Sequence, residues 1–258
     1  MPIVESGLDL SHDKIAEQIN KQVILKICDA YGLRIEDWEG TLVLKNVERY
    51  DGSIVDDLKV PVKLILEVKE DDDAKTSRGG FNGARVRMSI KPKFTEVVHG
   101  VPHILRDKSP VNFSAYCSTI QHELQHHIDS LIHDEETNKR NKAPKKDERA
   151  SKDEYYTSVN EFRAFLRQLV YVIEVRSSRL IEKELGTLDL KERESVFDAN
   201  LHDFVKFLED TKVLTPGLKN FIEANKSVPE HWSKIEAILE KAQKSLKRRY
   251  DYVGYSGA

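Results

Sequence analysis

The sequence predicts an α+β protein in which a small three-stranded antiparallel sheet packs against a histidine-rich helix, followed by an α-helical C-terminal lobe. Two observations predict this class. Apolar and polar residues alternate in three segments between residues 41 and 92, which is the period of half-buried strands. Apolar residues then recur at helical spacing from about residue 114 to 133, and again from residue 159 almost to the C-terminus.

The first element is predicted to be an amphipathic helix from Asp13 to about Tyr31. Ser11 is a candidate N-cap, and Gly32 is a candidate stop signal. The apolar face consists of residues that recur at helical spacing: Ile15, Ile19, Val23, Ile24 and Ile27. This helix is expected to pack on the sheet that follows it.

The sheet is predicted from three segments: TLVLKNV (41–47), VPVKLILEV (60–68) and ARVRMSIKP (84–92). YDGS interrupts the chain between the first two, and EDDDAKTSRGGFNG between the last two is predicted to be a loop. Val86, Met88 and Ile90 share one face of the third strand. We therefore expect helices to cover one side of the sheet.

A loop with His99, His103 and two prolines comes next, and a helix from about Ser114 to His133 follows it. Residues 134–154 contain no large apolar side chain, so we predict an exposed, mobile loop there. This loop divides an N-terminal unit (1–133) from a helical lobe (155–258). The lobe is predicted to hold one long helix from Phe162 to Ile181 and three others, within 195–210, 220–226 and 231–250.

Composition limits the classes of partner. Lys and Arg total 41 against 44 Asp and Glu, so a formal charge of -3 gives no reason to expect nucleic acid as the main partner. No segment approaches the roughly 18 apolar residues of a membrane span, and the N-terminus has no signal-peptide pattern. Cys28 and Cys117 are expected to be reduced thiols. These features predict a cytoplasmic protein that does not enter a membrane.

The sequence HELQH, from His122 to His126, is an HExxH motif on the predicted central helix. Residues four apart on a helix lie roughly 40° apart around its axis and about 6 Å along it, so His122 and His126 can both bind one metal ion. Glu123, next to the first ligand, is placed to take a proton from a water that the metal activates. The motif predicts a zinc site with Glu123 as general base.

Other polar residues of this helix are further candidates for metal ligands. The long metzincin motif, HExxHxxGxxH, has Gly where this chain has Asp129 and a third His where it has Ile132. His133 lies one residue beyond the position of that third His. Asp129 is predicted to lie on the same face of the helix as His122 and His126. Three roles are open for it: to orient a histidine ligand, to bind the metal directly, or to be an ordinary surface residue. His127 points away from that face and is predicted to be a surface residue or a contact behind the ligands.

A catalytic zinc site needs a third protein ligand from elsewhere in the chain. Glu161 in EYYTSVNEFRAF is the best candidate, because it lies in the first turn of a predicted helix. Glu161 also follows the candidate N-cap Ser158 by three residues, which is the spacing of a capping box. The pattern therefore leaves two roles open for Glu161: metal ligand and helix cap.

QHELQHHIDS followed by YYTSVNEFRAF resembles the zincin-like metallopeptidases of the gluzincin type found in phage and mobile-element proteins, and more loosely the minimal gluzincins of the ImmA/IrrE kind. The resemblance covers roughly residues 81 to 165. It implies that His122, His126 and Glu161 bind zinc, that Glu123 is the base, and that Ala164 allows close helix packing. Those families often have proline before the Glu, where this chain has Val159 and Asn160.

The resemblance further implies that the parts before the charged loop and after it form one zincin-like unit, and that ARVRMSIKP is an edge strand to which a substrate peptide can add. Tyr155 and Tyr156 are candidate donors to the oxyanion, with aromatic packing as the alternative role of each. The expected function is zinc-dependent hydrolysis of a protein or peptide. The alternative is a non-catalytic virion or effector component on a zincin scaffold, recognised by a fourth protein ligand such as His133 or Asp129.

Overall fold

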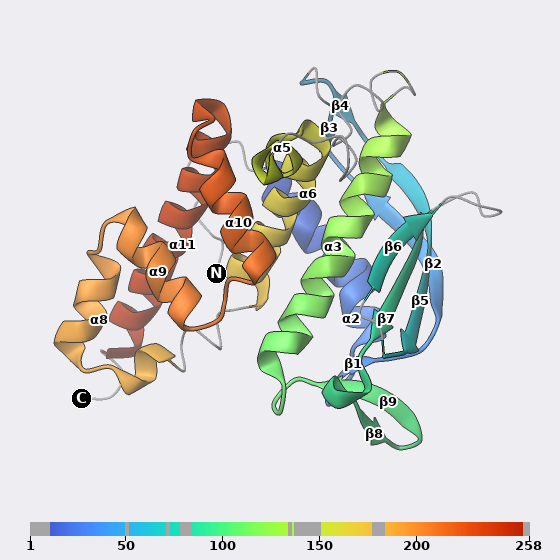
Figure 1. Cartoon of the computed structure of the whole chain (residues 1–258), viewed down its shortest axis with the longest axis horizontal. Coiled ribbons are helices and arrows are strands. Elements are labelled where there is room, and N and C mark those ends of the chain that lie inside the picture. The colour runs from blue at the N-terminus through green and yellow to red at the C-terminus, as the bar shows by residue number, and fades with distance from the viewer. Residues whose placement is uncertain are drawn as a thin grey trace.

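The structure, a computed structural model, describes residues 11–49, 52–70, 73–77, 84–133, 136, 151–176 and 184–254. The expected α+β class is confirmed. A twisted sheet forms one side of the molecule, the long helix α3 (Pro110–Ile132) crosses its inner face, and the C-terminal helices lie on the other side of α3 (Figure 1). The helix with the HExxH motif is therefore the central element of the fold.

The N-terminal helix is present, but it ends earlier than predicted. It consists of α1 (Ser11–Ile19), one turn of π-helix η1 (Asn20–Ile24) and α2 (Leu25–Ile27). Asp29 stops it, because Asp29 Oδ1 accepts hydrogen bonds from the backbone amides of Tyr31 at 2.8 Å and Gly32 at 3.1 Å. The predicted apolar face is confirmed, since every one of its residues is buried.

The three predicted strands exist, but the sheet they form differs from the expected one. They are β2 (Trp38–Leu44), β5 (Leu58–Val68) and β7 (Ala84–Ile90), in a four-stranded sheet of order β2-β5-β7-β6. The fourth strand, β6 (Asp73–Ser77), lies in the segment predicted to be a loop. β5 pairs with β7 in parallel and the other two pairings are antiparallel, so the expectation of a purely antiparallel three-stranded sheet from these segments was wrong.

The parallel pairing follows from β6. The sequence DAKTS has no apolar alternation, so the hydrophobic pattern gives no sign of a strand there. β6 and β7 pair as an antiparallel hairpin, which leaves β7 running in the same direction as β5. β6 is thus the edge strand beside α3, and the implied edge position of ARVRMSIKP was wrong (Figure 1).

Two smaller sheets make up the rest of the β structure in the described residues. A three-stranded antiparallel sheet has the order β1-β9-β8, and a two-stranded ribbon pairs β3 with β4. The short 3-10 helix η2 (Pro92–Phe94) precedes β8. Most of the expected loop with His99 and His103 is therefore a β-hairpin. The strands of the small sheets are β1 (Gly32–Arg34), β3 (Val47–Glu48), β4 (Ile54–Val55), β8 (Glu96–Val98) and β9 (Val101–Leu105).

The helix with the HExxH motif begins earlier than expected, at Pro110 after the N-cap Ser109, since proline is favoured at the first helical positions. The later helices are α5 (Lys152–Thr157), α6 (Val159–Val170), η3 (Tyr171–Arg176), α8 (Leu190–Phe197), α9 (Leu201–Asp210), α10 (Pro216–Asn225) and α11 (Pro229–Gly254). The segment 195–210, predicted as one helix, is two helices because the Asn200 side chain caps α9 by accepting from the amide of Asp203.

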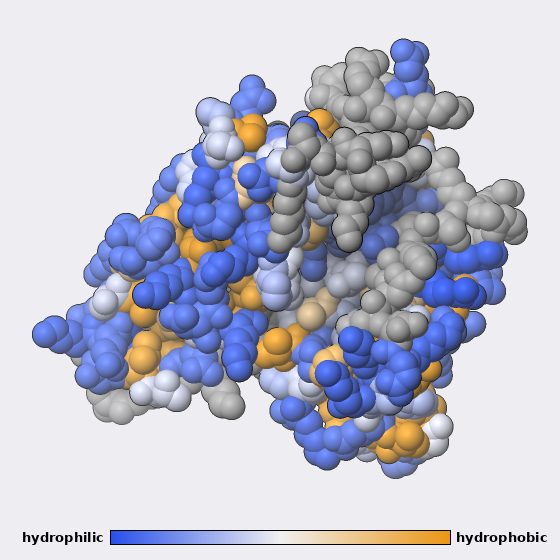
Figure 2. Space-filling view, viewed as in Figure 1, coloured by the Kyte–Doolittle hydropathy of each residue, from blue (hydrophilic) through white to orange (hydrophobic). Residues whose placement is uncertain are grey.

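The predicted exposed loop falls almost entirely outside the described residues. Only residue 136 and residues 151–154 of it are described, and the last three of these form the first turn of α5. Ser151 caps that turn by accepting from the amide of Glu154. The face in Figure 2 is mainly hydrophilic, with apolar patches between the C-terminal helices. None of the helices in the described ranges is long and apolar enough to cross a membrane.

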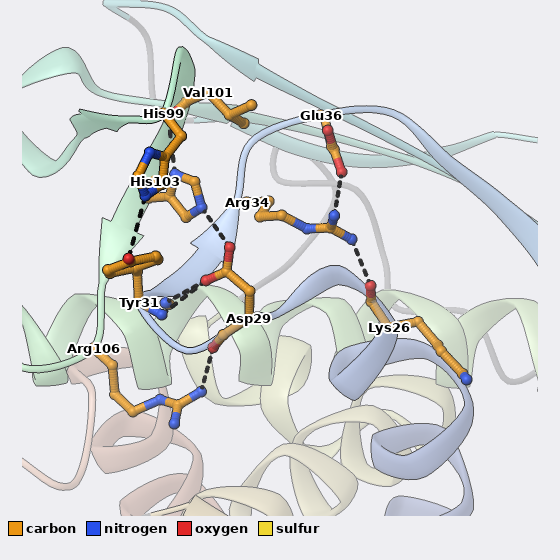
Figure 3. Close-up of polar contacts among 10 residues, drawn as sticks. Lys26, Asp29, Tyr31, Arg34, Glu36, His99, Val101, His103 and Arg106 are labelled. Atoms are coloured by element: carbon orange, nitrogen blue, oxygen red, sulfur yellow. Dashed lines mark hydrogen bonds and ion pairs between the residues drawn. The ribbon is translucent and has the colours of Figure 1, made fainter.

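A polar cluster fastens the β8–β9 hairpin to the turn after α2 (Figure 3). The buried His103 ring contacts the carbonyl oxygen of Val101 through Nδ1 at 2.8 Å and Asp29 Oδ2 through Nε2 at 3.0 Å. The carbonyl and the carboxylate are acceptors, so both bonds form together only when both ring nitrogens carry protons. Asp29 thus joins a turn, a helix end and a hairpin.

Replacing Asp29 by Asn is expected to destabilise the fold in a pH-dependent way. Burial alone would raise the pKa of Asp29, but hydrogen bonds from His103 and two backbone amides lower it on balance. A depressed folded-state pKa stabilises the protein above the unfolded carboxyl pKa of about 3.9, and this stability is lost as the pH falls through the folded value. Urea unfolding of Asp29→Asn and wild type should differ most at pH 5.5 and converge below about pH 4.

The matched control is Asp198→Asn, which removes a carboxylate from an exposed ion pair with Lys247. Its difference from wild type is expected to be small at both pH values, because exposed pairs contribute little. A difference between Asp29→Asn and wild type that stays constant from pH 5.5 to pH 3.5 would contradict the role given to the Asp29 carboxylate.

Candidate metal centre

His122, His126 and Glu161 come together although Glu161 belongs to a different helix from the histidines. The histidines lie on neighbouring turns of α3, and Glu161 lies in the first turn of α6. α6 packs along α3, and Ala164, which is fully buried, is part of α6. The side chains of His122, His126 and Glu161 are 9%, 24% and 13% exposed, so the group is largely shielded and His126 is the most accessible of the three.

The donor atoms have the spacing of a metal site. His122 Nε2 and His126 Nε2 are 3.1 Å apart, and each lies 3.5 Å from an oxygen of Glu161. Bonds of 2.0–2.1 Å in a tetrahedral arrangement place any two donors about 3.3–3.4 Å apart. The 3.5 Å separations involve different oxygens of Glu161, Oε2 toward His122 and Oε1 toward His126, and all three separations are close to this value. One donor atom from each residue lies within 4.8 Å of the others, so this group could hold a metal ion.

The two roles left open for Glu161 are now distinguished. Ser158 is the N-cap of α6, but its side chain makes no capping bond, and its hydroxyl donates instead to the carbonyl oxygen of Tyr155 at 2.9 Å. The Glu161 carboxylate faces the histidines rather than the amide of Ser158. The capping box that the spacing permitted is not formed, and Glu161 belongs to the group of three residues that could hold a metal ion.

Charge at the centre favours an ionised carboxylate. Burial alone would raise the pKa of Glu161, but His122 and His126 hold it well below its usual range. Burial would lower the pKa of His126, but the carboxylates of Glu161, Glu123 and Asp129 raise it on balance. The negative oxygens of Glu161 thus lie opposite two imidazoles, which is a suitable donor set for a divalent cation of intermediate softness.

Unsatisfied polar atoms support the same fit. Within the described ranges, Glu161 Oε2 is buried and makes no hydrogen bond. A buried carboxylate oxygen without a hydrogen bond is costly, and a cation bound by the three residues would satisfy it. His122 Nδ1 is also buried without a hydrogen bond, and the Phe165 ring lies against the His122 imidazole with a centroid distance of 4.5 Å.

Glu123 and Tyr155 border the ligand group, and Tyr156 lies deeper in the core. Glu123 is half-buried, and its charge acts on both His126 and Tyr155. Burial and the neighbouring carboxylate of Glu161 raise the pKa of Tyr155 well above its ordinary value, so its hydroxyl stays a donor. Tyr156 is 7% exposed and packs on the Phe165 ring at 5.1 Å, which corresponds to the alternative role of aromatic packing.

The remaining polar residues of α3 do not join the ligands. Asp129 is buried, and its Oδ1 is engaged by Gln125 at 2.8 Å and by Arg163 at 3.0 Å rather than by a ligand imidazole. His127 is only 2% exposed, so its placement on the surface was wrong. His133 is the C-cap of α3 and stands outside the ligand group found among the described residues.

Two residues near the centre were missed by the sequence reasoning. Arg163 follows Glu161 by two residues and pairs with Asp129, while Phe165 packs on His122. Both lie in the quoted segment EYYTSVNEFRAF, where only the carboxylate and the tyrosines had a recognisable chemical role. The sequence did contain a signal for this ion pair. An Arg lies close to the candidate ligand Glu161, and an Asp lies about one turn after the HExxH motif on the helix that α6 packs against.

No family model, no curated protein and no solved structure matches this chain. The likeness to gluzincins therefore stays a prediction, supported by the motifs and by the arrangement of their side chains.

Proposed function

We propose that this protein is a zinc-dependent metallopeptidase of the gluzincin type. The observation that carries the proposal is the grouping of two Nε2 atoms, 3.1 Å apart, with one carboxylate, whose two oxygens each lie 3.5 Å from one of them. The histidines come from an HExxH helix and the carboxylate from a second helix packed on it. Zinc held there would supply a Lewis acid that activates water and polarises a peptide carbonyl.

The residues around the three proposed ligands have complementary roles. Glu123 lies next to the ligand His122 in sequence and its charge reaches the centre, so it is the general base that takes a proton from the attacking water. Tyr155, kept protonated beside Glu161, is the donor toward the oxygen that becomes negative during attack. Tyr156 supports Tyr155, as the centroids of their rings are 5.1 Å apart.

The number of protein donors favours catalysis over a structural metal. In the described part of the chain, the group contains three ligand residues, and Asp129 and His133 are outside it. A structural zinc site is closed by a fourth protein ligand, whereas a catalytic site keeps a position for water and substrate. The non-catalytic virion or effector component is therefore the less favoured alternative.

The substrate is proposed to be a protein or peptide. β6, the edge strand of the sheet, lies beside α3, and an extended peptide can pair with such an edge. Cys28 and Cys117 form no disulfide with each other, which supports a reducing compartment such as the cytoplasm as the place of action.

Removing the metal is expected to abolish peptide hydrolysis reversibly. Incubation of the full chain with 1,10-phenanthroline should remove the activity on a peptide library, and added zinc should restore it, because the Lewis acid is lost and regained. Activity is measured by mass spectrometry of the cleavage products. Hydrolysis that persists in the chelator after metal analysis shows less than about a tenth of an equivalent of zinc would rule out this mechanism.

A further inference from the structure

We propose that the buried ion pair between Arg163 and Asp129 is a positioning device that holds Glu161 opposite His122 and His126 before any metal binds. The inference rests on the proposed metal site, but it concerns metal affinity and does not depend on the substrate. Asp129 is not among the three residues of the ligand group, and the guanidinium of Arg163 has no lone pair to offer a metal. We call this pair the interhelical clamp.

The clamp joins the same two helices that supply the ligands. Asp129 lies three residues after His126 on α3, which is about 4.5 Å along the axis, and Arg163 lies two residues after Glu161 on α6. Arg163 Nε and Asp129 Oδ1 are 3.0 Å apart, and the side chains are 12% and 2% exposed. The ion pair therefore bridges α3 and α6 within about one turn of the ligands.

Further bonds fix both partners of the clamp. Gln125 Nε2 donates to Asp129 Oδ1 at 2.8 Å, and Arg167 Nε donates to Gln125 Oε1 at 2.9 Å, which adds a second connection between α3 and α6. Arg163 also donates to the carbonyl oxygen of Glu48 on β3 at 2.8 Å. With these bonds the guanidinium of Arg163 has a defined position relative to both helices and a strand.

The clamp is an energetically demanding arrangement for a helix interface. Taking an Asp and an Arg out of water carries a desolvation penalty, and a well-packed apolar pair often stabilises a fold as well or better. Removing one partner leaves the other charge buried without compensation, which is strongly destabilising to the local geometry. The best-attested benefit of a buried pair is fixed register between elements, and register is what the metal centre requires.

Only one of the three proposed ligands depends on the position of α6 along α3. The separation of His122 and His126 is set by the geometry of a single helix, whereas Glu161 reaches them only if α6 keeps its place along α3. A shift of α6 by one ångström would change both 3.5 Å separations between Glu161 and the histidines. The clamp should therefore affect metal binding through Glu161 and not through the histidines.

The test is a double-mutant cycle read out by zinc affinity, measured by competition with a chromophoric chelator. Asp129→Asn replaces the carboxyl group that faces Arg163 with an amide of nearly the same shape. In the wild-type background it is expected to weaken zinc binding about 10- to 100-fold, the usual effect of removing a group that orients a ligand. In a Glu161→Gln background, the same substitution should change zinc affinity by less than about 3-fold, because the ligand it positions is already lost.

Each outcome decides the inference. An equal loss in both backgrounds would mean that Asp129 acts on the histidines or on the whole fold, and unchanged affinity in the wild-type background would mean that the clamp positions nothing. Both results overturn the inference and leave the proposed function standing. A wild-type chain that binds no zinc would overturn the proposed function and this inference together, and zinc binding without hydrolysis would overturn the function alone.

Two controls accompany the cycle. Glu209→Gln breaks an exposed ion pair with Lys219 in the C-terminal helices and should leave zinc affinity unchanged. Thermal unfolding of each metal-free variant identifies a chain that fails to fold. If Asp129→Asn does not fold, Arg163→Lys keeps the charge but loses the hydrogen bond from the guanidinium to the carbonyl oxygen of Glu48, and it is expected to weaken zinc binding in the same background-dependent way.

Discussion

Replacing Glu123 by Gln is expected to lower kcat for peptide hydrolysis about 10²- to 10⁴-fold while zinc remains bound. Gln has nearly the same shape as Glu but cannot accept the proton of the attacking water. Glu123 is not part of the ligand group, so its substitution leaves the three donors in place. Activity and zinc content are measured on the same preparation, which separates loss of the base from loss of the metal.

The matched control for this substitution is Glu154→Gln. Glu154 is an exposed residue of α5, close in sequence to Tyr155, so the same chemical change occurs near the centre but outside it. This variant is expected to hydrolyse the peptide at the wild-type rate. If Glu123→Gln retains more than about a tenth of wild-type activity with zinc bound, Glu123 is not the general base.

Removing one ligand is expected to weaken zinc binding by at least about 10²-fold. Zinc sites with four ligands bind with apparent free energies of roughly 10–16 kcal/mol, so each ligand contributes on the order of 3 kcal/mol. His122→Ala and Glu161→Ala should each show this loss in chelator competition. Equal losses would also indicate that the carboxylate from α6 is as much a ligand as the imidazoles from α3.

His99→Ala is the matched control for the ligand variants, because it removes an exposed histidine of the β8–β9 hairpin. Its zinc affinity should equal that of the wild type. A Glu161→Ala chain with unchanged affinity would show that two histidines alone account for metal binding, and the third ligand would have to be sought elsewhere.

The histidine ligands could be predicted from the sequence because their geometry is local. Two residues four positions apart on a helix have a fixed separation, so HELQH already implies that two imidazoles can meet. Glu161 could be identified as a candidate ligand, but its role could not be decided from the sequence, since its spacing from Ser158 also suits a capping box. The decision depends on where the Ser158 hydroxyl points, and that is a tertiary property.

Other features could not be predicted from local patterns. β6 has a polar sequence, and its pairing through backbone hydrogen bonds with β7 leaves no hydrophobic period to detect. The burial of Asp129 and of Arg163 depends on the packing of α3 against α6, since neither side chain would be buried in isolation. The sequence therefore predicted the α+β class and the motif helix better than the sheet topology and the surroundings of the ligands.

The zinc content of the purified full chain, determined by inductively coupled plasma mass spectrometry, bears on every part of this proposal. About one zinc ion per chain is expected for the wild type, as for a site with three protein ligands, and the ratio should fall close to zero when His122→Ala and Glu161→Ala are combined. A wild-type chain without stoichiometric zinc, or a doubly substituted chain that keeps its zinc, would contradict the assignment of His122, His126 and Glu161 as the ligands.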